Sequence, residues 1–145
     1  MQLFISIKNA ITLPNRDEII KAMWEKAFSV SHALDLKEFN SLMLSWDKWI
    51  DDTRWSDGIP KSFEHINFEF RNNKLIIVEV DDNALLVDKR ALYRSAIFIA
   101  ERTNGTISMD NSTWITANEL CEYANNYLKY TFDEAVEISF NQIVR

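Results

Sequence analysis

Apolar and polar residues alternate at the beginning of the chain and then change to helical spacing. The alternation predicts a first strand over residues 3–7, which ends before Pro14. Asn15 followed by Glu18 has the form of a capping box and predicts the start of a helix. The helix is expected to continue with apolar residues at helical spacing, namely Ile19, Ile20, Met23, Trp24, Ala27 and Phe28.

A second helical pattern follows. Asp35 and Glu38 have the spacing of another capping box and predict a helix that fades near Asp52. Gly58 and Pro60 then end the region. The residues expected on the buried side of this helix are Phe39, Leu42, Met43, Trp46, Trp49 and Ile50.

The apolar period then changes from the helical value to 2, which is typical of strands. The two adjacent asparagines in this region can adopt the positive φ values that a tight hairpin turn requires. His65 and Glu69 fall on the polar face of the first strand. The predicted order is a strand over 66–70, a turn at Asn72 and Asn73, a more buried strand over 75–80, a turn at 81–83 and a short strand over 84–87.

The last third of the chain is dominated by helix signals. Residues 132–143 fit a strand, because Val136, Ile138 and Phe140 alternate, but they also fit a helix, and the preceding capping box favours the helix. The other predicted features are a helix from its cap Asp88 to about Arg102, a stop at Asn104 and Gly105, a strand over 106–109, a turn over 110–113, and capping boxes at Thr116 with Glu119 and Thr131 with Glu134.

These elements predict an α+β fold, with about five helices packed on a small, mostly antiparallel sheet in a single domain over residues 1–145. Two glycines and two prolines in 145 residues are too few for a sandwich of many short strands. An apolar content of 47% is that of a globular chain with a substantial core.

Charge and cysteine content narrow the function classes. The net charge is −6, and the segment from Thr103 onward contains six acidic residues but only two basic ones, Lys129 and Arg145. This charge balance argues against a nucleic-acid-binding surface. The single cysteine, Cys121, excludes an internal disulfide and a zinc site built from cysteines. No apolar run reaches membrane-spanning length, and the N-terminus lacks the pattern of a signal peptide, so we expect a cytoplasmic protein without a membrane partner. The oligomeric state is left open.

Motifs of known chemistry are missing, so we expect no catalysis and no cofactor. There is no glycine-rich phosphate loop, no HExxH pair and no nucleophile elbow. Carboxylates near a predicted hairpin end could still form a Mg²⁺ or Ca²⁺ site. His65 and Glu69 could still form an acid–base pair. The carboxylates in question are Glu79, Asp81, Asp82 and Asp88. The alternative function is therefore a small metal- or carboxylate-dependent enzyme.

The segment SWDKWIDDTRWSDG combines three tryptophans with four aspartates. On a helix, Asp47 and Asp51 would repel each other, and Asp52 and Asp57 near its C-terminus would oppose the macrodipole, which is a reason to expect a surface held ready for a basic protein partner. The competing interpretation is core tryptophans with solvated aspartates. The predicted partner contacts are Asp47, Asp51, Asp52, Trp55 and Asp57, and the secondary candidates are Glu122 and Glu137.

The consecutive segments ALYRSAIFIAERTNGTISMDNSTW and ITANELCEYANNYL resemble small bacterial toxin-immunity proteins, which accompany polymorphic or contact-dependent inhibition toxins. The likeness covers about a third of the chain. It implies an acidic cytoplasmic α+β domain that binds a cognate toxin, often a nuclease with a basic active-site surface. A phage anti-defence protein would have the same composition and differ in its partner. The likeness is carried by Thr103, Gly105, Ile107, Ser108, Asp110 and Trp114.

Overall fold

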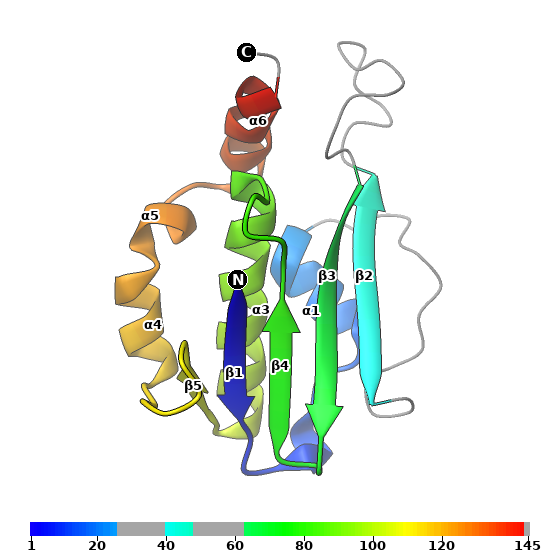
Figure 1. The fold of residues 1–145 in the computed structure, drawn as a ribbon, viewed down its shortest axis with the longest axis vertical. Helices are drawn as coiled ribbons and strands as arrows, with labels where there is room; N and C mark the ends of the chain where they lie inside the picture. The colour runs from blue at the N-terminus through cyan, green and yellow to red at the C-terminus, as the bar shows by residue number, and fades with distance from the viewer. Residues whose placement is uncertain (26–39, 48–62, 144–145) are drawn as a thin grey trace.

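An antiparallel sheet forms one layer of the fold (Figure 1). The computed structural model describes residues 1–25, 40–47 and 63–143. In these residues the strand order is β2–β3–β4–β1–β5, and every pair of neighbours is antiparallel. The strands are β1 (Gln2–Ser6), β2 (Ser41–Asp47), β3 (Phe63–Arg71), β4 (Leu75–Glu79) and β5 (Thr106–Ser108).

Helices cover one face of this sheet. The longest, α3, runs along the strands behind β1 and β4 and contacts each of the other described helices (Figure 1). The predicted α+β fold is therefore confirmed. The described helices are the 3-10 helix η1 (Ala10–Thr12) and the α-helices α1 (Arg16–Trp24), α3 (Leu86–Thr103), α4 (Ala117–Tyr123), α5 (Asn125–Leu128) and α6 (Phe132–Ile143).

The hydrophobic core lies between the sheet and α3. Register places Leu42, Phe68, Val78 and Leu3 side by side across β2, β3, β4 and β1, and all four are buried. An aromatic cluster extends this core, with the ring centroids of Trp24 and Trp46 6.0 Å apart and those of Trp46 and Phe132 5.2 Å apart. The strand residues and the tryptophans thus belong to one core, whose members include Phe68, Phe70, Ile76, Val78, Trp24 and Trp46.

Most local signals in the sequence are confirmed. The side chain of Asn15 accepts from the N–H of Glu18, and the Glu18 carboxylate accepts from the N–H of Asn15, which completes the predicted capping box. The same reciprocal bonds occur between Thr116 and Glu119 and between Thr131 and Glu134. Residues 132–143 form a helix, as the capping box at Thr131 and Glu134 predicted.

The predicted helix from Asp35 to Asp52 is wrong where the structure describes it, because residues 41–47 form strand β2. Leu42, Leu44 and Trp46 are buried, whereas Met43, expected to be buried, is 51% exposed. Alternation therefore describes this segment, and pairing of its whole length with residues 63–69 of β3 stabilises it as a strand. Residues 35–39 and 48–52 lie outside the described part of the chain.

The predicted strand over 84–87 is also wrong, as is the assignment of Asp88 as a helix cap. Leu85 is the N-cap of α3, and Asp88 lies in the first turn, fully buried. The free N–H groups at this end are capped by α6 instead: Leu86 donates to Oε1 of Gln142 at 3.1 Å and Val87 to Oγ of Ser139 at 2.9 Å. A long-range contact thus replaces the local cap.

Candidate functional site

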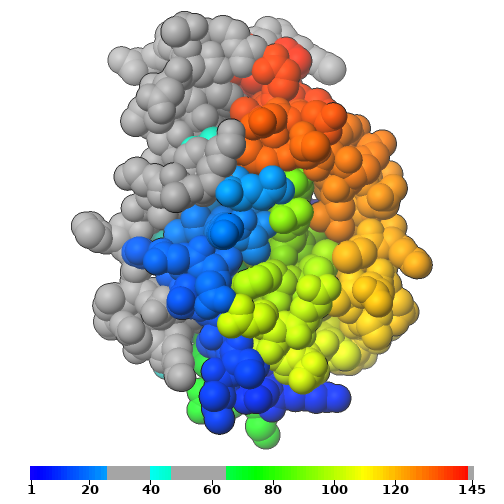
Figure 2. All heavy atoms as spheres, turned by 180° about the vertical axis from the view of Figure 1, so that it is seen from behind, coloured from blue at the N-terminus to red at the C-terminus, as the bar shows by residue number. Residues whose placement is uncertain are grey.

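A groove of about 740 Å³ lies on the helical side of the molecule. Figure 2 shows α3 reaching the surface there, between α1 and the α4–α5 segment. Its size lies within the range of ligand-binding pockets. The groove is lined by Glu18, Lys21, Ala22, Glu25, Arg94, Ile97, Phe98, Glu101, Arg102, Cys121 and Leu128.

Two rows of side chains on α3 form the floor of the groove. Residues four apart lie on the same side of a helix, so Arg94, Phe98 and Arg102 make one row and residues 93, 97 and 101 make the next. Contacts of the first row are with α1, whereas Tyr93, in the second row, stacks on Tyr127 of α5 with ring centroids 5.2 Å apart. The floor is therefore divided between an α1 side and an α4–α5 side.

Ion pairs fix the α1 side. Nη1 of Arg102 donates to the carboxylate of Glu18, and its guanidinium lies 5.6 Å from the centre of the Phe98 ring. Arg94 donates from Nε to the carbonyl of Ala22 at 2.6 Å and lies 3.5 Å from a carboxylate oxygen of Glu25. The hydrogen bond from Arg102 lowers the pKa of Glu18. The charges of these two arginines are thus largely matched inside the protein.

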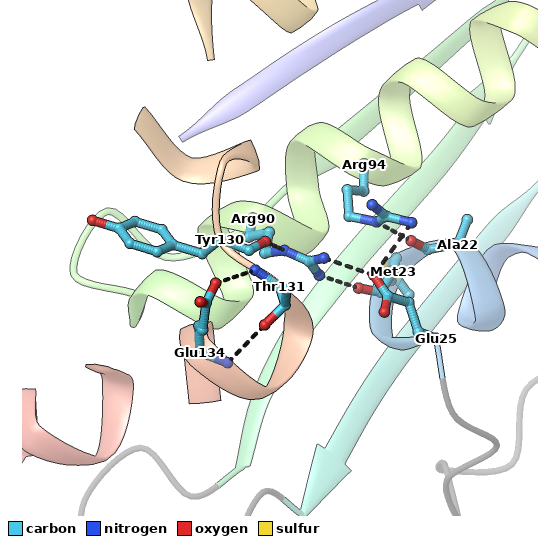
Figure 3. A network of polar contacts seen from close by, with 8 residues as sticks. All are labelled: Ala22, Met23, Glu25, Arg90, Arg94, Tyr130, Thr131 and Glu134. Atoms are coloured by element: carbon cyan, nitrogen blue, oxygen red, sulfur yellow. Dashed lines mark hydrogen bonds and ion pairs between the residues drawn. The ribbon is translucent and has the colours of Figure 1, made fainter. Parts of the chain in front are cut away.

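A buried arginine lies at one end of this wall (Figure 3). Arg90 is 2% exposed; its Nε donates to the carbonyl of Tyr130 at 3.0 Å and its Nη2 to Glu25 Oε1 at 2.7 Å. A longer contact of 3.5 Å joins Nη1 to the carbonyl of Met23. Glu25 caps the end of α1 in the left-handed conformation, with φ of 63°. Cations beside the last carbonyls of a helix are favourable, so Arg90 ties α1 and the α5–α6 junction to α3.

The opposite wall is less charged. Cys121 is half-buried, and burial, followed by the charges of Glu101 and Glu122, raises the pKa of its thiol. Burial also raises the pKa of Tyr93 to about 12. Both groups are therefore neutral near pH 7. The thiol is not activated as a nucleophile, and this wall presents mainly apolar surface to the groove.

The predicted partner contacts fall largely outside the described part of the chain. Asp47 is the last residue of β2, so it does not lie on the helix that the sequence predicted for it. The remaining members of that set, Asp51, Asp52, Trp55 and Asp57, lie outside the described residues. The secondary candidates are both exposed, Glu122 on α4 and Glu137 on α6.

The acidic side chains between residues 110 and 137 are all exposed. Local structure accounts for three of them: Asp110 accepts from the N–H groups of Ser112 and Thr113, and Glu119 and Glu134 belong to capping boxes. The bonds from Thr113 and Ser112 hold the pKa of Asp110 well below its usual range. The one basic residue in this range, Lys129, lies 5.1 Å from the Tyr130 ring centre. Glu122, Asp133 and Glu137 therefore give the α4–α6 surface negative charge without a capping role.

The carboxylates of the alternative function are not brought together. Asp88 is buried, whereas Asp81 accepts from the N–H of Asn83 at 2.7 Å and Asp82 pairs with the amino group of Met1. In residues 1–25, 40–47 and 63–143 no three His, Cys, Asp or Glu side chains are grouped to hold a metal ion. The described helices include none with the length and apolar character needed to cross a membrane.

One member of the expected acid–base pair, Glu69, already forms an ion pair with Arg71. Glu69 and His65 do share the exposed face of β3, as the alternation predicted. The Glu69 carboxylate is bound by Arg71, with Nε 2.7 Å from Oε1, and this hydrogen bond lowers the pKa of Glu69. A carboxylate held ionised in this way is a weaker proton acceptor than a free one.

Sequence reasoning missed the groove. Its floor was visible as the i, i+4 spacing of Arg94, Phe98 and Arg102, which puts two cations and an aromatic ring on one side of a helix. The position of α1 and α4 on either side of that floor depends on tertiary packing. No local pattern encodes it.

Comparison with known proteins adds no family to this picture. No protein-family model, curated protein or solved structure matches the chain. The function is therefore argued from the groove, the ion pairs and the acidic surface.

Proposed function

We propose that this protein is an immunity-type inhibitor, which binds a cognate toxin domain in the cytoplasm and covers a basic surface on it. The partner would be a protein whose active site is shaped for nucleic acid or nucleotide, since such sites are positively charged. The inhibitor itself would perform no chemistry. Binding alone would block the toxin.

The observation that carries this proposal is the charge of the α4–α6 surface. Six acidic side chains from residue 110 to residue 137 are exposed, and Lys129 is the one basic residue among them. An excess of exposed charge of one sign accelerates association with a partner of opposite sign and makes that association sensitive to salt. The net charge of −6 has the same sign.

Two acidic regions are candidates for the contact. The sequence favours residues 47–57, and that assignment stays a prediction. The α4–α6 surface, with Glu122 and Glu137, is the region whose exposure supports a contact directly. An inhibitor that uses both would present acids on two separate parts of the chain.

The test is co-purification with the protein encoded by the adjacent gene, followed by growth rescue of cells that express that protein. We expect a stable complex, rescue of growth, and an association rate that falls as salt is raised. Absence of both binding and rescue would overturn the proposal. The neighbouring genes also distinguish an immunity protein from a phage anti-defence protein, which would use the same surface chemistry on another partner.

A further inference from the structure

We propose that the pair Asn104–Gly105 is a site of spontaneous deamidation, which the fold keeps closed and unfolding opens. In this reaction the backbone nitrogen of Gly105 attacks the side-chain Cγ of Asn104. Its proton passes through water to the side-chain amide nitrogen, the bond from Cγ to that nitrogen breaks, and ammonia leaves. Water then opens the succinimide ring and gives aspartate or isoaspartate at this position. The site bears on the lifetime of the chain and goes beyond the proposed function.

The sequence makes this pair reactive when the chain is unfolded. Glycine has no Cβ to hinder attack by its own nitrogen, and it leaves the backbone free to reach the geometry of ring closure. The chain contains one Asn–Gly pair, since its other glycine, Gly58, follows Asp57. The side chain of Asn104 is exposed in the folded protein, so water also reaches its amide. Composition and exposure alone would therefore predict a reactive site in the folded protein as well.

The backbone conformation of the pair holds the two reacting groups apart. Ring closure requires Cβ of Asn104 and the nitrogen of Gly105 to eclipse each other about the Cα–C bond. Asn104 is the C-cap of α3 in the left-handed conformation, with φ of 52° and ψ of 38°. At this ψ the Cβ of an L residue lies nearly opposite the following nitrogen. The attack therefore cannot begin until the Cα–C bond of Asn104 rotates out of the cap.

Hydrogen bonds and close packing oppose that rotation. The N–H groups of Asn104 and Gly105 both donate to the carbonyl of Ala100, the second at an N–O distance of 2.8 Å. The attacking nitrogen is therefore engaged as a donor in the left-handed cap that ends the helix. On its other side, Gly105 packs so closely against the carbonyl of Ser6 that a Cβ atom would clash there. The pair is thus fixed from both α3 and β1.

Fraying of the helix end alone does not release the site. Figure 1 shows that α3 ends beside β1 and that the chain passes directly into β5, which pairs with β1 from Thr106 onward. Thr103, just before the pair, is buried; its hydroxyl donates to the carbonyl of Ile99 at 2.7 Å, and its own carbonyl accepts from the N–H of Lys8 at 3.3 Å. Opening the site therefore requires separation of α3 from β1 and β5. Such a separation is expected only in a large-scale unfolding event.

The isoaspartate product does not fit the junction between α3 and β5. In isoaspartate the main chain runs through the former side chain, which adds one carbon atom to the backbone at residue 104. Gly105 has no room to shift against Ser6, and the pairing of Thr106 with Ser6 begins at the next residue. The aspartate product keeps the length of the backbone but adds a negative charge at a helix C-terminus, where cations are favoured. The pair therefore converts an unfolding event into a permanent change of the chain, most severely through isoaspartate.

Protection by the fold is tested by incubating the protein near neutral pH, once folded and once unfolded in guanidinium chloride. Mass spectrometry of the proteolytic peptide that carries residue 104 follows the loss of the amide. We expect deamidation of Asn104 to be at least about tenfold slower in the folded protein, because the reaction proceeds from the open state alone. In the unfolded chain Asn104 should react faster than Asn111, which precedes Ser112 and serves as an internal reference. Equal rates at Asn104 in the folded and unfolded protein would overturn the inference.

Refolding of the aged chains tests the consequence. The matched control Asn104→Gly tolerates the same backbone conformation and cannot deamidate at this position, whereas Asn104→Asp carries the charge without the additional carbon. After ageing in guanidinium chloride and dilution, we expect the refolded fraction of the unmodified protein, measured by circular dichroism, to fall in step with its isoaspartate content at residue 104. Aged Asn104→Gly should refold as completely as fresh protein, and Asn104→Asp should separate the effect of charge from that of backbone length. If chains that carry isoaspartate at residue 104 refold as completely as aged Asn104→Gly, the assignment of a closed junction fails.

Discussion

Arg90 and Glu25 form an ion pair whose two members have very different access to water. The arginine side chain is 2% exposed and the glutamate side chain 43% exposed, with Nη2 2.7 Å from Oε1. The guanidinium is therefore hidden between helices while its counter-ion faces solvent. The two backbone carbonyls that it also contacts make it a structural link between α1, α3 and the start of α6.

Removing this link should destabilise the protein. Arg90→Met keeps the apolar stem but leaves the carbonyls of Tyr130 and Met23 without this donor, and we expect a loss of about 2–4 kcal/mol in the free energy of unfolding. Arg94→Met is the matched control; its side chain is 36% exposed, so water can replace its bonds and the loss should be about 1 kcal/mol or less. Urea denaturation followed by circular dichroism measures both. Equal losses would contradict the role assigned to burial.

The cap of α3 by α6 gives a second prediction. Ser139→Ala removes the acceptor of the Val87 N–H inside the protein, where water cannot replace it, and should lower the free energy of unfolding by about 1–3 kcal/mol. Gln142→Ala removes the acceptor of the Leu86 N–H at an exposed position and should have an effect of about 0.5 kcal/mol or less. Thermal or urea denaturation of the two variants compares them, and a larger effect at Gln142 would argue against α6 as the buried cap.

Gly105 allows a close approach between the end of α3 and β1. A Cβ atom at this position would clash with the backbone carbonyl oxygen of Ser6, so Gly105→Ala should cost about 1–3 kcal/mol as the backbone shifts. The positive φ of the stop belongs to Asn104 instead, at 52°. Asn104→Gly should therefore leave stability unchanged or slightly raised. Denaturation midpoints of the pair decide between these two roles for the adjacent residues.

Burial of Tyr93 makes the fold sensitive to alkali. Its pKa is raised from 10.0 to about 12, so between these values the unfolded chain loses a proton that the folded protein keeps. Stability from this group is complete below about pH 10 and is lost as the pH rises towards about 12. Comparing Tyr93→Phe with the unmodified protein in urea at several pH values should show the unmodified protein losing stability relative to the variant in that range. Parallel curves from pH 9 to 12 would contradict the prediction.

The partner contact can be located by comparing the two acidic regions. Asp51, Asp52 and Asp57 changed together to Ala should weaken toxin binding, by about 2–5 kcal/mol where an acid is desolvated against a cation, and leave the fold at least as stable. The comparison variant changes Glu122 and Glu137 to Ala. Calorimetric titration with the toxin measures both. If the first variant binds normally and the second does not bind, the assignment to residues 47–57 is wrong even though the inhibitor proposal stands.

Local chemistry explains why so much of the fold could be predicted. The three capping boxes and the Asn72–Asn73 turn, with φ values of 54° and 55°, depend on residues within four positions of each other. Such signals survive in any tertiary context. The period-2 pattern of β3 and β4 likewise gave the buried faces correctly, because one side of each strand must meet the core.

The errors arose where distant residues decide the structure. Leu42 and Trp46 fit helical spacing and strand alternation equally well, and only pairing with β3 selects the strand. The cap of α3 comes from Ser139, which lies 52 residues away and could not be read beside Asp88. The groove depends in the same way on how α1 and α4 pack on α3. The role of the exposed acids Glu122 and Glu137 as partner contacts therefore stays a prediction, and the hollow between the helices could not be predicted from the sequence.

The place of β1 inside the sheet also determines when the fold can be completed. Its two neighbours are β4 and β5, formed by residues 75–79 and 106–108, so neither edge of β1 is paired until most of the chain exists. During synthesis β1, with its apolar residues Leu3 and Ile5, has no strand partner through that interval. Contacts of such long sequence separation slow folding and expose strand edges to aggregation. A protein with this strand order can complete its sheet only after residues 106–108 have left the ribosome.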